Sequence, residues 1–510
     1  MKKAPIALVI ALILNSVCTL AQQDAARTPK QFSDSYDAYV RNTMARIPDI
    51  PGVAIVVIKD DKSIFVRGYG MADKETGTKA DADTLFYIAS STKSFTALAA
   101  ALLDKEGKIK LSDPMTKYAS GMAFKTPMPD KITIRDLLVH TSGLTNDPLT
   151  FRMAYSGESD AKEIARVFAD GTSFVDANFG KYKYDNLGYN IYGVLLQNHL
   201  NAKWQDVLQE RIFDPLGMKH TTAYISRARS KKWAVAAPYV ISHQDGKIVR
   251  SPLAKKDNNL QSAGGMFASI SDIGKWLNMN MNGGKLNGKQ VFPADIIRAA
   301  HTGYTRTVRD APPFNGDGEY GLGWQIGRYK GEEVIYHHGG FPGYRSHISF
   351  LPDKKIAVAV LVNEGNAGGR AADMLATYAY DSWLGETNVE ADYAKRLQEL
   401  VDANERAKQR AMASFAERAK RTSQLTKPLG DYTGKYVNEL FGTIQVTSNG
   451  NALVVKMGNI EVASTAFTAP ETIRVEMIPG MGEVIKFNND PLDKVESLTY
   501  DGNKFIKVQS

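Results

Sequence analysis

The 510-residue chain contains a single cysteine, Cys18. An internal disulfide needs two cysteines and a thiolate zinc site needs several, so neither kind of framework is available to this chain. Cys18 also lies in an N-terminal segment that we predict to be removed, and the mature protein would then have no cysteine nucleophile. The chemistry of this protein therefore has to come from oxygen and nitrogen side chains.

Long hydrophobic runs are absent after the N-terminus. Residues 1–21 carry two lysines, an apolar run over 7–14 and a small residue at Ala21, a pattern that predicts a secretory signal peptide cleaved after Ala21. The apolar run is short for a bilayer-spanning helix, so we expect no stable membrane insertion after cleavage. The predicted location is periplasmic or secreted.

A strong charge of either sign is also missing. The chain has 63 Lys and Arg against 55 Asp and Glu, and the net charge of +8 is spread along its length. Basic runs interleaved with aromatic residues, which are typical of nucleic-acid-binding segments, do not occur, so a nucleic-acid partner is not expected.

Two common hydrolase motifs are missing as well, namely G-x-S-x-G and H-E-x-x-H. Three other short motifs do occur, in the order Ser90-x-x-Lys93, Tyr184-x-Asn186 and His337-x-Gly339. Ser-x-x-Lys alone is a weak signal, because residues 159–162 fit it too. The order and the flanking residues of the three motifs together predict a serine hydrolase that works through an acyl-enzyme.

The first motif supplies a nucleophile and a base. Serine needs a base within hydrogen-bond reach, and a spacing of three residues on a helix places Lys93 beside Ser90. Lys93 must be neutral to accept a proton, and both burial and the positive end of a helix lower the pKa of a lysine. Apolar residues before Ser90 and after Lys93 predict that this turn is buried, whereas Ser159 lies in a polar segment where a helix cap is the better interpretation.

The second motif lies in a loop that leads into an apolar helix. We predict that Tyr184 passes protons to the leaving group and that Asn186 contacts the substrate carbonyl and orients Lys93. Taken alone, this motif is more typical of a packed tyrosine and a turn asparagine, so its interpretation depends on the other two.

The third motif ends a predicted strand. An edge strand here can pair with an extended substrate, and Gly339 allows a close approach of the backbone. We predict that the backbone N–H groups of Gly340 and Ser90 form the oxyanion hole. The histidines around His337 do not have the spacing of a zinc motif, and we expect neither a metal nor another cofactor.

Strand patterns at both ends of residues 22–387 enclose helical patterns. Apolar runs at 53–58 and 63–70, and three more between 332 and 363, predict strands, and residues 368–384 predict a helix that covers them. We therefore predict an α+β fold, in which an antiparallel sheet is flanked by helices and the middle of the chain forms an all-helical subdomain.

The remaining sequence divides into two further segments. Residues 388–424 predict a charged helix with one apolar face, which serves as a linker packed along the main domain; a dimerising coil is the alternative. In residues 425–510, short alternating runs separated by turn signals such as Asn449-Gly450 predict a small all-β barrel.

Longer segments around the motifs resemble the serine β-lactamase and penicillin-binding-protein superfamily, in its class C-like branch. They are residues 132–144, 212–221, 261–277, 320–326 and 337–352. The resemblance covers roughly residues 30–385 and implies the β-lactamase/transpeptidase-like form of the fold. The segment 425–510 resembles the lipocalin-like β-domain that some of these hydrolases carry.

The resemblance implies that Ser90 is acylated and that Lys93 and Tyr184 share the acid–base work. It also implies that Asn186 and the strand from His337 to Gly340 hold the substrate. True class C β-lactamases have a lysine at the position of His337; that lysine is charged at neutral pH, whereas a histidine is mostly neutral. The histidine variant resembles D-alanyl-D-alanine carboxypeptidases, D-aminopeptidases and some esterases.

The leading hypothesis is therefore a secreted serine peptidase or amidase that acts on small peptides, including peptides with D-residues. The nearest alternatives are an esterase or a β-lactamase of the same family, so the expected partner is a small peptide, ester or β-lactam substrate. A non-catalytic protein that binds cell-wall peptide is the alternative from another class.

Overall fold

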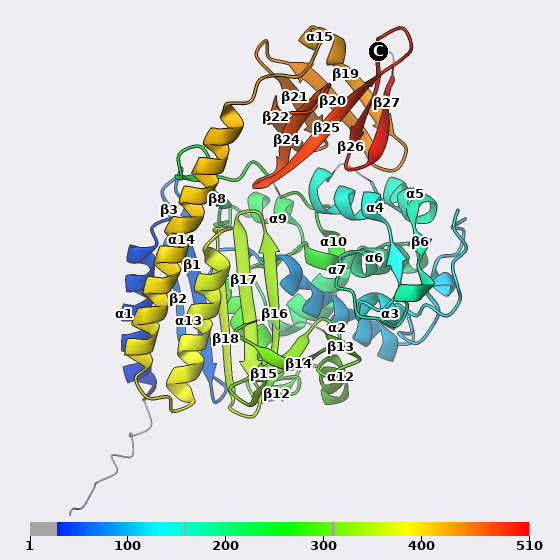
Figure 1. Cartoon of the computed structure of the whole chain (residues 1–510). Coiled ribbons are helices and arrows are strands. Elements are labelled where there is room, and N and C mark those ends of the chain that lie inside the picture. Colours follow the sequence, from blue (N-terminus) through cyan, green and yellow to red (C-terminus); the bar gives the residue numbers. More distant parts are fainter. Residues whose placement is uncertain (1–27, 158–159, 254, 308–311, 509–510) are drawn as a thin grey trace, which may run out of the picture.

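The computed structural model describes residues 28–157, 160–253, 255–307 and 312–508 (Figure 1). The predicted signal peptide, residues 1–21, lies outside the described residues. Within the described ranges, no helix combines the length and the hydropathy that crossing a bilayer requires.

A nine-stranded antiparallel sheet with the order β13-β14-β15-β16-β17-β18-β1-β2-β3 forms the centre of the molecule. Its strands are β1 (Gly52–Lys59), β2 (Lys62–Asp73), β3 (Thr78–Lys79), β13 (Thr305–Thr307), β14 (Asn315–Tyr320), β15 (Gln325–Tyr329), β16 (Glu332–Phe341), β17 (Tyr344–Leu351) and β18 (Ile356–Val362). The N-terminal strand β1 pairs with β18 from Val53↔Val362 to Lys59↔Ile356. The sheet therefore forms only when sequence-distant strands meet.

Strand β1 is buried on both faces because its side chains alternate between two cores. Its odd-numbered residues, from Val53 to Val57, lie in one core with helices α1 (Pro29–Arg46) and α13 (Gly368–Trp383). Its even-numbered residues lie in the other core, with helix α11 (Ile270–Met281). Figure 1 shows α1 and α13 together on one side of the sheet. This double burial explains the continuous apolar run of β1.

The chain between β3 and β13 contains most of the described helices, but it also contains short strands, so it is not the all-helical subdomain that the sequence predicted. Its helices are α2 (Thr92–Lys105), α3 (Ile134–Leu138), α4 (Asp147–Phe151), α5 (Ala161–Gly171), α6 (Leu187–Leu200), α7 (Trp204–Leu208), α8 (Asp214–Leu216), α9 (Ile225–Ser230), α10 (Gln261–Gly264), α11 and α12 (Ala294–Ala300). Its short strands are β4 (Phe86–Tyr87), β5 (Leu144–Thr145), β6 (Ser173–Phe174), β7 (Thr221–Thr222), β8 (Tyr239–Ile241), β9 (Ile248–Arg250), β10 (Phe267–Ala268), β11 (Lys285–Leu286) and β12 (Lys289–Gln290).

Helix α14 (Val389–Ala419) buries apolar side chains on the main domain mainly in its first half, and Lys408 in its second half forms an ion pair with Asp49 at 3.1 Å. Tyr393, Leu397 and Leu400 are buried against α1 and α13. Met412 lies farther along the apolar face that the sequence predicts for residues 388–424, and it is 36% exposed. The second half of the helix rises toward the C-terminal sheet (Figure 1), where Phe415 lines a cavity.

The C-terminal segment begins with the short helix α15 (Leu429–Tyr432) and forms a second nine-stranded sheet, in the order β22-β21-β20-β19-β27-β26-β25-β24-β23. Its strands are β19 (Gly434–Asn438), β20 (Gly442–Ser448), β21 (Leu453–Met457), β22 (Ile460–Ala463), β23 (Thr465–Ala466), β24 (Thr472–Ile478), β25 (Met481–Asn489), β26 (Val495–Tyr500) and β27 (Asn503–Val508). Strand β22 also contacts β24, so the sheet curls into a nearly closed barrel. The predicted fold class, α+β followed by a small all-β barrel, is confirmed.

The barrel docks on the helical region beside α4 and α5. Arg152 Nη1 donates to Leu440 O at 2.9 Å, and Arg166 Nη2 donates to Glu439 O at 2.6 Å. The ring of Phe151 lies 6.2 Å from that of Phe441. Polar and aromatic contacts thus hold the barrel against the rest of the protein.

We predict that Leu361→Ala in β18 lowers the free energy of unfolding by about 2–5 kcal/mol, because Leu361 is fully buried and its removal leaves a cavity in the core. Leu492→Ala is the matched control, since Leu492 is 79% exposed and its loss should change stability by less than about 0.5 kcal/mol. Chemical denaturation measures both variants. Equal effects of the two substitutions would contradict the assigned core.

Candidate active site

Ser90 lies in the 3₁₀ turn Ala89–Ser91, between strand β4 and helix α2. The serine therefore precedes α2 rather than opening it. Ala89, directly before it, has φ of 44°. A residue with a side chain rarely adopts this left-handed conformation, and strain of this kind tends to occur at functional sites.

Strands β16 and β17 hold this turn in place. Ser346 Oγ donates to Ile88 O at 2.9 Å, and Ser91 Oγ donates to His337 O at 3.3 Å. A Cβ at Gly339 would lie only 2.0 Å from Ile88 O, so β16 can approach the turn this closely only with glycine at that position. The third motif is thereby brought against the first.

Lys93 is fully buried in the first turn of α2, and its Nζ is surrounded by three oxygens. The Nζ donates to Ser90 Oγ at 3.3 Å, to Asn186 Oδ1 at 2.7 Å and to Ala263 O at 2.9 Å. Burial lowers the pKa of Lys93 to about 7, although the nearby Asp185 acts in the opposite direction.

The three oxygens around Lys93 are not equivalent. Asn186 Oδ1 and Ala263 O can only accept hydrogen bonds, so they take the two N–H groups of a neutral amine. The amine lone pair is then left for Ser90 Oγ, the one oxygen of the three that carries a proton. This arrangement suits a base that removes the proton of Ser90.

The second motif is positioned by a loop ahead of α6. Lys183 N donates to His140 O at 2.9 Å, and Asp185 N donates to His140 Nδ1 at 3.4 Å. A Cβ at Gly188 would lie 2.1 Å from Leu137 O, so glycine allows α6 to pack tightly on α3. These contacts carry Asn186 to the Lys93 amine.

Tyr184 lies over the same amine. Its ring centroid is 5.0 Å from Lys93 Nζ, and the residue is 37% exposed. The ring is 4.6 Å from that of His140 and 6.2 Å from that of His337. Tyr184 thus borders both the buried base and the solvent, which is the placement that a proton carrier needs.

The side chain of His337 lies inside the protein and is 1% exposed. Its Nδ1 is 2.7 Å from His338 O, and its Nε2 is 3.3 Å from Tyr320 Oη. Burial and the charge of Lys93 lower the pKa of His337 to about 3, so the ring is neutral at physiological pH. It cannot hold a substrate carboxylate as a charged lysine would.

The sequence predicted a strand that ends at the two histidines, but strand β16 continues to Phe341. Its pairing with β17 extends to Phe341↔Tyr344, whereas its pairing with β15 stops at Tyr336↔Gln325. Within the described sheet, residues 337–341 therefore have one edge without a neighbouring strand. Gly340 lies in this segment and is exposed.

The sequence motifs missed two residues of the site. The buried ring of His140 lies 4.7 Å from that of Tyr320, and both pack beside Tyr184. Burial, followed by the charge of Lys93, holds the pKa of His140 well below its usual value. The only signal was that both residues lie in segments that carry the family resemblance.

Three potential metal ligands meet on the other side of β16. Asp373 Oδ1 lies 2.7 Å from His347 Nδ1 and 3.0 Å from His338 Nε2. The Asp373 carboxylate can accept an N–H group from each histidine, and these hydrogen bonds explain why the three side chains lie together. We therefore assign no metal to the cluster, and the absence of a cofactor stays a prediction.

The fold is similar to solved structures of known proteins. The octameric penicillin-binding protein homologue from Pyrococcus abyssi aligns with a TM-score of 0.60 and 22% identity, over 93% of this chain and 99% of that one. The D-amino acid amidase from Ochrobactrum anthropi aligns with a TM-score of 0.52 and 22% identity, over 74% of this chain and 99% of the amidase.

Among curated proteins, the chain is 26% identical to "Unguisins hydrolase ungD" from Aspergillus violaceofuscus, over 78% of this chain and 73% of that protein. It is 25% identical to "Protein flp" from Staphylococcus aureus, over 62% of this chain and 60% of that protein. Residues 37–380 match the family model described as Beta-lactamase. This match covers most of the chain and includes Ser90, Lys93, Tyr184 and the strand β16, so the protein belongs to the beta-lactamase family.

Proposed function

We propose that this protein is a serine hydrolase that forms an acyl-enzyme on Ser90 and cleaves small peptides or amides, including those with D-residues. The observation that carries the proposal is the buried Lys93, whose Nζ lies 3.3 Å from Ser90 Oγ and whose pKa is lowered to about 7. The similar protein "Unguisins hydrolase ungD" is named as a hydrolase, which agrees with the proposed reaction type.

In the proposed reaction, neutral Lys93 takes the proton of Ser90 while Oγ attacks the substrate carbonyl carbon. The backbone N–H groups of Ser90 and Gly340 stabilise the negative charge on the carbonyl oxygen. The proton then passes through Tyr184 to the leaving nitrogen as the carbon–nitrogen bond breaks. Asn186 keeps the amine of Lys93 oriented through the 2.7 Å hydrogen bond.

Water completes the cycle. It gives a proton to Lys93, by way of Tyr184, as its oxygen attacks the ester carbon on Ser90. The carbon–oxygen bond to Ser90 breaks, the serine recovers its proton from Lys93, and the acid product leaves. The base and the acid thus exchange roles between the two half-reactions.

The unpaired edge of β16 favours a peptide substrate over other acyl donors. Residues 337–341 can pair with an extended peptide as an added strand. An ester without a peptide backbone cannot form these hydrogen bonds. The neutral, buried ring of His337 lacks the charge that would hold the carboxylate of a β-lactam. An esterase remains the alternative, because an ester is cleaved more easily by the same groups.

A protein that only binds peptide would need none of the acid–base groups. Here Ser90, Lys93 and Tyr184 are all present and lie together, which supports the enzyme over the binding protein.

We propose the following organisation of the chain. Residues 1–21 are a signal peptide, 22–387 the hydrolase domain, 388–424 a helical linker and 425–510 a small β-barrel. The protein acts in the periplasm or outside the cell.

We predict that the purified protein gains the mass of an acyl group, or turns over, with at least one of three donors. These are a chromogenic β-lactam, a p-nitrophenyl ester and a D-alanyl-D-alanine peptide. Ser90→Ala should lose both adduct and turnover, because the other two oxygens that accept from the Lys93 amine, Asn186 Oδ1 and Ala263 O, carry no proton to give. Intact-protein mass spectrometry makes the measurement.

Ser159→Ala is the control for this experiment, since Ser159 belongs to the second Ser-x-x-Lys pattern. It should leave labelling unchanged. An adduct that persists in Ser90→Ala, or that disappears in Ser159→Ala, would assign the nucleophile elsewhere.

We predict that the acylation rate rises with pH through about 7 and levels off above it. The pKa of Lys93 is lowered to about 7, so the amine is protonated and inactive below that value and neutral above it. Lys93→Met should lower the rate about 10²–10⁴-fold, whereas Lys105→Met, an exposed position at the end of the same helix, should not. A profile that is flat or falls through pH 7 would be incompatible with Lys93 as the base.

We also predict that the mature protein starts at Gln22 when it is expressed in a bacterium with a secretion pathway. N-terminal sequencing of the material outside the cytoplasm measures this. Recovery of the chain with Met1 intact, and only in the cytoplasm, would contradict the predicted location.

A further inference from the structure

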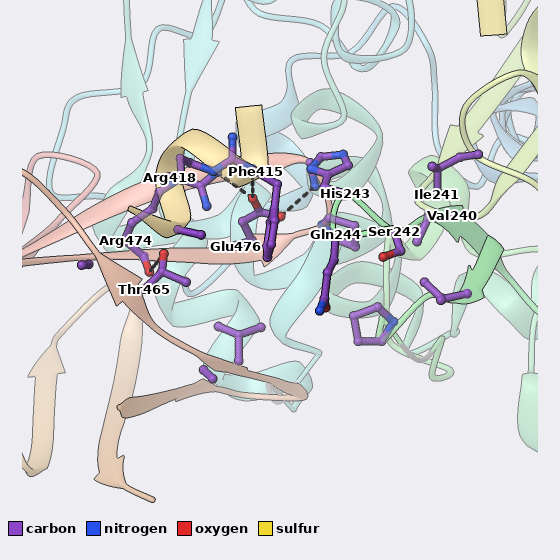
Figure 2. Close-up of a pocket in the computed structure, with 18 of the residues that line it drawn as sticks. Val240, Ile241, Ser242, His243, Gln244, Phe415, Arg418, Thr465, Arg474 and Glu476 are labelled. Carbon is purple, nitrogen blue, oxygen red and sulfur yellow. Dashed lines mark hydrogen bonds and ion pairs between the residues drawn. The ribbon is translucent and has the colours of Figure 1, made fainter. Parts of the chain in front are cut away.

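A cavity separate from the candidate active site lies where the end of α14 meets the barrel (Figure 2). It has a volume of about 650 Å³ and is bordered by β8 with the turn after it, by the last turn of α14 and by strands β22 to β24. This volume falls within the range of small-molecule binding sites. Ser90 is not part of its lining.

Positive charge gathers around this cavity. Its lining includes Arg418, Arg421 and Arg474. Among the described lining residues, Glu476 is the one acidic side chain. Arg474 Nη2 lies 2.6 Å from Glu476 Oε1, and Arg418 Nη2 lies 3.8 Å from the same oxygen. Figure 2 shows the side chains of Arg418, Arg474 and His243 gathered around this carboxylate. Two guanidinium groups thus share one carboxylate, and Arg421 adds a third positive charge to the lining.

This charge is held in partly dehydrated surroundings. The side chains of Arg418 and Arg474 are 16% and 14% exposed. Burial, followed by repulsion from Arg474, lowers the pKa of Arg418. Because Glu476 is the one carboxylate among the described lining residues, the three positive charges are not fully compensated. A bound anion would complete the neutralisation, because guanidinium groups bind carboxylates by charge-assisted hydrogen bonds.

The rest of the lining is largely apolar. It includes Val240, Ile241, Val249, Phe415, Val462 and Pro479. A cavity with apolar walls and a cationic end fits a ligand that has an apolar body and a terminal carboxylate. An inorganic anion would leave the apolar walls unused.

The cavity continues toward the active site. A neighbouring cavity of about 490 Å³ shares part of its lining, including Ile241, His243 and Pro479. This neighbour is also lined by Gly340 and Phe341, at the open end of the substrate strand β16. The turn between β24 and β25 borders both cavities. A chain bound along β16 can therefore extend past this turn to the three arginines.

We propose that Arg418, Arg421 and Arg474 form a subsite for a terminal carboxylate, at the far end of an extended and partly apolar substrate whose reacting carbonyl lies at Ser90. We call it the arginine subsite. The proposal rests on the proposed function, because it assigns one end of the molecule that the hydrolase cleaves. It makes the barrel and α14 part of substrate recognition.

The test uses p-nitrophenyl monoesters of dicarboxylic acids of increasing chain length, each compared with the ester whose distal carboxylate is replaced by a carboxamide. The two members of a pair have nearly the same size and differ in charge. From the chain length that spans the two sites, the carboxylate ester should be favoured about tenfold or more in kcat/KM, mainly through a lower KM. The preference should weaken at high salt.

Arg418→Gln and Arg421→Gln should each remove most of this preference and leave the kcat/KM of the carboxamide ester unchanged. Arg410→Gln is the matched control, because Arg410 lies exposed on the same helix and does not line the cavity. Thermal unfolding shows whether each variant is folded. If Arg418→Gln is unstable, Arg421→Gln carries the test, because Arg421 forms no ion pair with a carboxylate in the part of the chain that the structure describes.

The outcomes separate this proposal from the proposed function. Turnover of both esters with no carboxylate preference at any length would overturn the arginine subsite and leave the hydrolase intact. Calorimetry of Ser90→Ala with the free dicarboxylic acid adds a second measurement. If the acid binds but the esters show no preference, the arginine subsite is also overturned, because the cavity would then bind an anion that is not part of the substrate. If no ester is turned over and Ser90 is never labelled, the proposed function fails and the substrate subsite fails with it.

Discussion

The active site depends on the burial of one lysine amine. A charged lysine in the interior is costly, so its surroundings stabilise the neutral form, and this form is the one that can accept a proton from Ser90. The amine is held by oxygens from three separate segments, the turn before α2, the loop before α6 and the end of α10. Any change that admits water or moves one of these segments would restore the charge and disable the base.

The architecture follows from this requirement. Strands β16 and β17 fix the serine turn, and glycine at position 339 allows their close approach. The central sheet forms only when β1 pairs with β18, which lies about three hundred residues later. The candidate site is therefore complete only when the region that matches the beta-lactamase family is fully folded. The barrel is added at the rim, where its β24–β25 turn adjoins the open end of β16.

Much of the fold and the site was predictable from the sequence. Ser90 and Lys93 are three residues apart, so local helix geometry places them together. The apolar runs of β1 and β18 predict buried strands. The rings of His140 and Tyr320 could not be predicted, because they meet through tertiary packing of residues far apart in the chain. The surface against which helix α14 packs could not be predicted for a related reason, since periodicity identifies the apolar face of a helix but not the element opposite it.

The most direct test of this account is the pKa of the Lys93 amine itself. Carbon-13 labelling of lysine side chains allows its titration to be followed by NMR, and the Lys93→Met variant assigns the signal. The account predicts a lysine that titrates near pH 7 in the free protein and disappears in the variant. A Lys93 signal that titrates above pH 10, as in an exposed lysine, would contradict the central claim that this buried amine is the base.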